Sequence, residues 1–144
     1  MNETEEVAEL YAAYLEKAET LERERKPGQG LFGFGQTPAD DPCHEAFIRG
    51  LKELLDGFLS AGAAQNNLAE CLAFIFHAPL DHRQPPSVYW TLLAAHSAAV
   101  EAAAALSQED AQRLYEQYDK EYPRRYRLPV QKQLMKALDR ARRG

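Results

Sequence analysis

The sequence predicts an all-α protein, and two observations lead to this prediction. Apolar residues recur at helical spacing along most of the chain, and no run shows sustained apolar–polar alternation with β-branched residues. A length of 144 residues is enough for one hydrophobic core. We therefore expect a single helical domain over residues 1–144, folded as an up-and-down bundle of five to six helices.

The first two helices are predicted from charge order and capping residues. Residues 2–26 begin with several Glu residues and end in LERERK, the order that a helix dipole favours, and a Pro-Gly pair follows. Asp41 and Pro42 supply an N-cap and a proline at the first position of the second helix. Apolar residues at helical spacing then continue to about Ala61.

The third and fourth helices are rich in apolar residues. Residues 68–76 form a short helix that is apolar nearly all round, and we expect it to end before Pro79. Pro86 stands at the start of the fourth helix, whose many alanines favour helix and permit close packing. The apolar stripe of this helix includes His96, which we interpret as a core histidine satisfied by one or two hydrogen bonds.

Two more helices complete the prediction. Ser107 and Asp110 resemble a capping box that opens the fifth helix, and Pro123 ends it. Pro129 starts the sixth helix, which has apolar residues on one face. The predicted core takes large apolar side chains from the second to the sixth helix: Phe47, Leu51, Leu72, Ile75, Leu92, Leu93, Leu114 and Leu134.

The connections between these helices differ in length, and this difference predicts where a site lies. Few residues join the second helix to the third and the fourth to the fifth, so each pair is expected to be an antiparallel hairpin. If every turn reverses the chain, the three longer connections meet at one end: residues 27–41, 78–85 and 123–128. Loops on a rigid scaffold usually carry binding groups, so we expect the functional site there.

The segment GQGLFGFGQ, residues 28–36, contains the spacing G-x-G-x-x-G. A dinucleotide-binding loop needs a strand before this motif and a helix that begins within it, and neither is predicted here. We therefore interpret residues 27–41 as a glycine-hinged connection that packs over an apolar surface. A moving lid is the alternative for the same segment.

The net charge of −5 is distributed unevenly along the chain. Residues 120–144 hold nine Lys or Arg and two acidic residues, a net charge of +7, which leaves −12 on residues 1–119. One interpretation is that the basic end neutralises the acidic first helix, within the fold or in a homodimer. The other is that the basic end binds a partner rich in phosphate.

Residues suited to metal binding or nucleophilic chemistry are expected at the loop-rich end: Cys43, His44, Asp81 and His82. They would form a Cys/His/carboxylate set, but their spacing matches no recognised metal motif. Cys43 lies in the first turn of its helix, where the dipole lowers a thiol pKa, although a partly buried inert thiol is the simpler interpretation. We expect no cofactor, and a metal- or thiol-dependent enzyme is the alternative function.

Arginine and aromatic residues form the preferred candidate for ligand binding at this end: Arg83, Trp90, Arg124, Arg125, Tyr126 and Arg127. Helix N-termini and arginine forks both favour anions, and three helix N-termini are expected there. The alternative is that the arginines pair with nearby Asp residues and with the carbonyls that end other helices.

The sequence therefore favours a binding or interaction module over an enzyme, with a protein partner or a small anionic ligand at the loop-rich end. A purely structural or dimerising role is a further alternative. A pI near 5.4 argues against nucleic acid as the partner. The acidic N-terminal sequence and the lack of an 18-residue apolar run predict a cytoplasmic protein without membrane contact.

Overall fold

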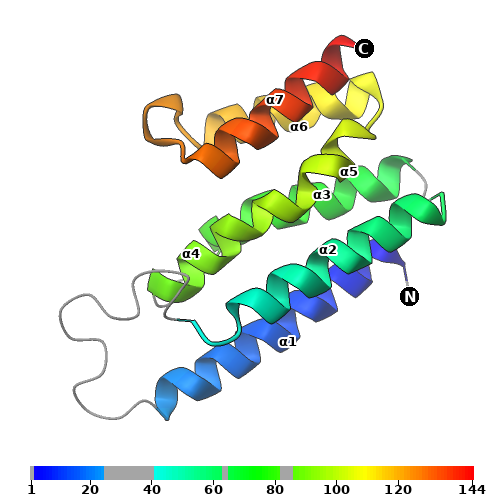
Figure 1. Ribbon diagram of the computed structural model, residues 1–144. Coiled ribbons are helices and arrows are strands. Elements are labelled where there is room, and N and C mark those ends of the chain that lie inside the picture. The colour runs from blue at the N-terminus through cyan, green and yellow to red at the C-terminus, as the bar shows by residue number, and fades with distance from the viewer. Residues whose placement is uncertain (1, 25–40, 63–64, 82–85) are drawn as a thin grey trace.

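The computed structural model describes residues 2–24, 41–62, 65–81 and 86–144, and their regular structure is helical throughout (Figure 1). α4, η3 and α5 follow one another without interruption, so these described residues form six successive helical rods and one short turn, η4. The all-α prediction is confirmed. The elements are α1 (Glu3–Arg23), α2 (His44–Ser60), α3 (Gln65–Asp81), α4 (Pro86–Ala94), η3 (Ala95–Ala99), α5 (Val100–Ala104), α6 (Gln108–Glu121), η4 (Arg124–Tyr126) and α7 (Pro129–Arg143).

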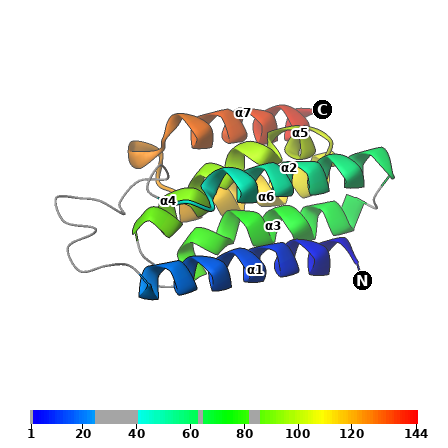
Figure 2. The same cartoon turned by 60° about the horizontal axis from the view of Figure 1, so that its bottom comes forward.

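Successive rods run in alternating directions, as expected for an up-and-down bundle (Figures 1 and 2). The N-termini of α2, α4 and α7 therefore lie at the same end of the bundle, together with the η4 turn. We call this end the η4 end. The predictions for the glycine-rich segment fall on residues 25–40, which lie outside the described part of the chain, as do residues 82–85.

Buried side chains from helices throughout the described chain form one hydrophobic cluster, which includes every residue of the predicted core. α1 contributes Val7, Tyr11, Tyr14 and Ala18, whose spacing of three and four residues places them on one face of the helix. Burying one large apolar side chain contributes about 1.5 to 3 kcal/mol. This shared core holds α1 on α2 and α3, and α7 on α5 and α6.

The start of α2 differs from the prediction by two residues. The Asp41 carboxylate accepts a hydrogen bond from the Cys43 N–H at 2.9 Å, and the Asp41 carbonyl accepts one from the His44 N–H at 3.1 Å. Asp41 therefore caps a turn that precedes the helix, and α2 begins at His44.

The prediction that the third helix ends before Pro79 is wrong, because α3 continues through this residue. Proline has no N–H, so it leaves the carbonyl four residues earlier, that of Ile75, without its usual helical donor. The ring of His96 donates to this carbonyl from Nε2 at 3.1 Å, and the Tyr122 hydroxyl donates to the next carbonyl, that of Phe76. The His96 side chain from η3 thus replaces the missing backbone donor, and the helix can include a proline.

The predicted fourth helix is one rod, but its middle tightens into the 3₁₀ segment η3, which carries His96. Because the Ile75 carbonyl can only accept, Nε2 of His96 holds the proton and Nδ1 accepts from the Tyr118 hydroxyl at 2.8 Å. His96 is fully buried, and burial lowers its pKa to about 3. The prediction of a hydrogen-bonded core histidine is confirmed.

The predicted starts of the last two helices are also confirmed. The Ser107 hydroxyl accepts a hydrogen bond from the Asp110 N–H at 3.2 Å, so Ser107 is the N-cap of α6. α7 begins at Pro129, and the side chain of Gln131 accepts from the Leu128 N–H at 2.9 Å. The second of these caps lies directly after the basic turn η4, where α7 begins.

Candidate functional site

The η4 turn joins α6 to α7 in the sequence PRRYRL. Pro123 precedes it with φ −56° and ψ 135°, an extended conformation that ends α6. The Tyr126 N–H then donates to the Pro123 carbonyl at 3.1 Å, and the Arg127 N–H donates to the Arg124 carbonyl at 3.4 Å. These bonds close a tight 3₁₀ turn, and its first two residues are arginines.

Arg127 holds this turn against the end of α6. Its side chain is only 5% exposed, and its Nε donates to the Tyr122 carbonyl at 2.8 Å. A second guanidinium nitrogen contacts the Asp119 carboxylate at 2.6 Å and the Asp119 carbonyl at 3.4 Å. A cation here satisfies carbonyls at the C-terminus of α6 and faces the negative end of its dipole. Arg127 is therefore engaged within the fold, which was the alternative expectation for the arginines.

In contrast to Arg127, all three residues of η4 face solvent. Arg124 and Arg125 are exposed, and Tyr126 is 74% exposed, the largest exposed fraction of any large apolar side chain in the described residues. Within the described ranges, no hydrogen bond or ion pair engages either of the two guanidinium groups. The turn thus presents two arginines and an aromatic ring from a backbone that Arg127 fixes.

The two remaining candidates for the anion site are Trp90 and Arg83. Trp90 lies on α4, whose N-terminus is at the η4 end; it is half-buried, and its ring meets that of Tyr89 edge-on at 5.2 Å. It packs against the core cluster, so part of its surface serves the fold. Arg83 lies outside the described residues.

A buried carboxylate, Asp41, forms a polar network that the sequence did not reveal. One oxygen, Oδ2, accepts from the hydroxyls of Tyr14 and Thr91, the latter at 2.8 Å. The Thr91 hydroxyl gives its only proton to Asp41, so it accepts from Nδ1 of His44 at 3.1 Å. The network connects α1, the start of α2 and α4. Its only sequence signal was the polar Thr91 among the apolar residues of the fourth helix.

Three of the four metal and thiol candidates, Cys43, His44 and Asp81, lie in the described residues. Cys43 is buried, and burial, together with the nearby Asp41 carboxylate, raises its thiol pKa. The thiol pKa is thus raised and not lowered, in agreement with the interpretation of Cys43 as an inert thiol. His44 bonds to Thr91 through Nδ1, Asp81 lies in the last turn of α3, and His82 is outside the described residues. Over residues 2–24, 41–62, 65–81 and 86–144, no group of three His, Cys, Asp or Glu side chains is arranged to hold a metal ion.

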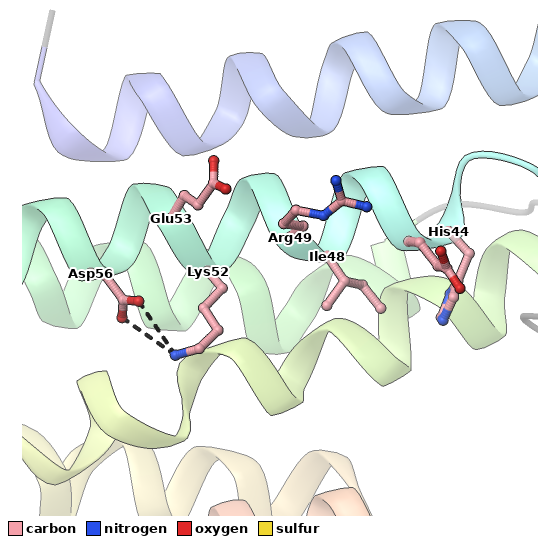
Figure 3. A pocket seen from close by; sticks show the side chains of 7 residues that line it. His44, Ile48, Arg49, Lys52, Glu53 and Asp56 are labelled. Atoms are coloured by element: carbon pink, nitrogen blue, oxygen red, sulfur yellow. Dashed lines mark hydrogen bonds and ion pairs between the residues drawn. The ribbon is translucent and has the colours of Figure 1, made fainter.

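An open pocket of about 560 Å³ runs along the outer face of α2 (Figure 3). Lys52 lies near its middle and pairs with Asp56 at 3.4 Å and with Glu101 at 3.6 Å. Its charges are of both signs and partly neutralise one another, so the pocket favours no ion of one sign. It is lined by His44, Glu45, Ile48, Arg49, Lys52, Glu53 and Asp56, all on α2.

Comparison with known proteins finds no family model, no curated protein and no solved structure that matches this chain. In the part of the chain that the structure describes, none of the helices has the length and apolar character needed to span a membrane.

Proposed function

We propose that the chain is a small helical binding module that contacts an acidic ligand, or an acidic segment of a protein partner, through the η4 turn. The observation that carries the proposal is the contrast within this turn. The Arg127 side chain is buried and holds the backbone, whereas the guanidinium groups of Arg124 and Arg125 are exposed and form no hydrogen bond or ion pair with another described residue.

The geometry suits recognition of carboxylate or phosphate groups. A guanidinium group presents a planar fork of donors that matches both anions. The contacts of Arg127 already hold the backbone of the turn, so binding need not order it. Tyr126 adds a flat exposed surface beside them. Exposed ion pairs each contribute about 0.2 to 1 kcal/mol, so we expect modest affinity.

The burial of Cys43 also argues against the alternative of a metal- or thiol-dependent enzyme. The Cys43 thiol is buried and its pKa is raised, so it is protonated near neutral pH. A protonated, buried thiol is neither a nucleophile nor a metal ligand. His44 lines the α2 pocket, but the hydroxyl bonded to its Nδ1, that of Thr91, is buried and gives its proton to Asp41.

The experiment measures binding of two probes, pyrophosphate and hexaglutamate, by NMR titration at constant ionic strength. The variant Arg124→Ala/Arg125→Ala removes two exposed charges from η4, and we expect it to bind about tenfold more weakly, equivalent to 1.4 kcal/mol. The matched control is Lys17→Ala/Arg113→Ala, which removes the same charge from exposed positions on α1 and α6. Equal affinity of the parent and the η4 variant, or no saturable binding by the parent, would contradict the proposal.

A further inference from the structure

Two helices carry exposed stripes of opposite charge. On α1, the exposed residues Glu5, Glu9, Glu16 and Glu19 recur at multiples of three and four residues, so they follow one face of the helix. On α7, a stripe of the same kind is formed by Lys132, Lys136, Arg140 and Arg143. We call these the acidic stripe and the basic stripe.

Most of these charges have no ion-pair partner among the described residues. Glu19 pairs with Arg23 at 3.3 Å, and Arg143 pairs with Asp139 at 3.0 Å. No ion pair joins any other side chain of either stripe to a residue that the structure describes. Three acidic and three basic side chains are thus available to a partner.

The two stripes cannot neutralise each other within one molecule. Figures 1 and 2 both place α1 and α7 on opposite sides of the bundle, with the other helices between them. α1 packs on α2 and α3, whereas α7 packs on α5 and α6. The interpretation in which the basic C-terminal segment neutralises the acidic first helix within the fold is therefore wrong for these outer faces.

The stripes match each other in length as well as in charge. At 1.5 Å per residue, the acidic stripe from Glu5 to Glu19 is about 21 Å long, and the basic stripe from Lys132 to Arg143 is about 17 Å long. We propose that the basic stripe binds the acidic stripe of a second copy of this chain. The proposal goes beyond the proposed function, because it uses neither Arg124 nor Arg125.

The placement of the stripes also determines the kind of assembly. A closed two-fold dimer buries the same patch on both copies, whereas this contact joins two different patches. Because the patches lie on opposite sides, a pair of copies joined by one contact still presents one free acidic stripe and one free basic stripe. The association is therefore head-to-tail and open-ended. It consists of exposed ion pairs, so it is weak and is suppressed by salt.

The test uses analytical ultracentrifugation of the full chain over a wide concentration range. In about 20 mM NaCl we expect the average mass to rise steadily with concentration above the monomer mass of 16.3 kDa, and in about 300 mM NaCl to stay near it. A monomer at all concentrations in low salt, or a mass that levels off at that of a dimer, would overturn the proposal.

Two variants then distinguish this contact from other modes of association. Glu5→Gln/Glu9→Gln/Glu16→Gln removes the acidic stripe, and Lys132→Gln/Lys136→Gln/Arg140→Gln removes the basic stripe. Each variant alone should stay monomeric in low salt. Mixed in equal amounts, they should form a 1:1 dimer that grows no further, because each retains the one stripe that the other lacks.

A third variant controls for net charge. Glu45→Gln/Glu53→Gln/Glu109→Gln removes three exposed acidic charges from α2 and α6, and it should associate as the parent does. Association that survives in either stripe variant, or the absence of a dimer in the mixture, would refute the head-to-tail contact. Binding of the basic stripe to anionic vesicles or to DNA without self-association would assign it a different partner and refute the contact as well. The proposed function is tested separately in the same variants. If they still bind the probes at η4 but self-association is absent, only the head-to-tail contact is refuted.

Discussion

The buried His96 should make the stability of the protein fall between pH 7 and pH 5. In the folded state its Nε2–H donates to the Ile75 carbonyl and its Nδ1 accepts from Tyr118, so the ring is neutral. Burial lowers its pKa from 6.5 to about 3. In the unfolded chain the ring is in water and takes up a proton near its ordinary pKa. Below pH 6.5 the unfolded state therefore binds more protons than the folded state, and lower pH favours unfolding.

The size of this effect follows from the two pKa values. Stability from this group is complete above the unfolded pKa of 6.5 and is lost progressively as the pH falls toward the folded pKa of about 3. At pH 5 the unfolded state gains about 2 kcal/mol relative to pH 7, and the full loss, reached only below the folded pKa, is about 5 kcal/mol. Domains of this kind are stable by about 5 to 15 kcal/mol, so the change at pH 5 is easily measured.

The assay compares urea unfolding of the parent and the His96→Gln variant at both pH values. A glutamine amide can donate to Ile75 and accept from Tyr118, but it does not titrate. Titration of carboxylates affects both proteins alike, so the parent should lose about 2 kcal/mol more than the variant between pH 7 and pH 5. His77→Gln is the control, since His77 is half-exposed and bonds to Glu121 at 3.1 Å; it should retain the loss seen in the parent. The same pH dependence in the parent and His96→Gln would refute the reasoning.

Three further predictions concern the polar groups of the described residues. Tyr14→Phe should lower the free energy of unfolding by about 1 to 3 kcal/mol, because it removes a donor to the buried Asp41. Tyr11→Phe should raise it by about 1 kcal/mol, because the buried Tyr11 hydroxyl has no partner among the described residues. Equal free energies of unfolding for the two variants in urea would contradict this prediction. Arg127→Ala should lower the free energy of unfolding by about 1 to 3 kcal/mol, with Arg124→Ala within about 0.5 kcal/mol of the parent in the same measurement. Iodoacetamide should modify Cys43 at pH 8 much more slowly in native protein than in urea, since burial raises its pKa, and equal rates by mass spectrometry would exclude a buried thiol.

The helices that could be predicted from the sequence are those whose signals are local. Ser107 and Pro129 each act within one turn of their own helix, and both start the helices that their positions indicated. The continuation of α3 through Pro79 could not be predicted in this way. It depends on His96, which lies far along the chain and reaches the freed Ile75 carbonyl only after the helices have packed.

The candidate site was predictable in composition but not in the roles of its residues. Arg124, Arg125 and Arg127 look equivalent in the sequence, yet only Arg127 returns to the end of α6, where the Tyr122 carbonyl and Asp119 provide acceptors. The burial of Asp41 was hidden for a similar reason. Its role as a cap is visible locally, whereas its bonds to Tyr14 and Thr91 require three segments to meet.

Two buried polar networks connect the helices of this bundle, and their positions bear on how binding can be tested. The Asp41 network connects α1, the start of α2 and α4, and the His96 network connects α3, η3 and α6. Hydrogen bonds of this kind are directional, so they fix which helices are neighbours more strictly than apolar contacts do. Neither network includes the exposed groups of η4 or of the two charged stripes. Substitutions there should change stability by no more than about 0.5 kcal/mol, so a loss of binding in those variants would report on the surface itself and not on unfolding.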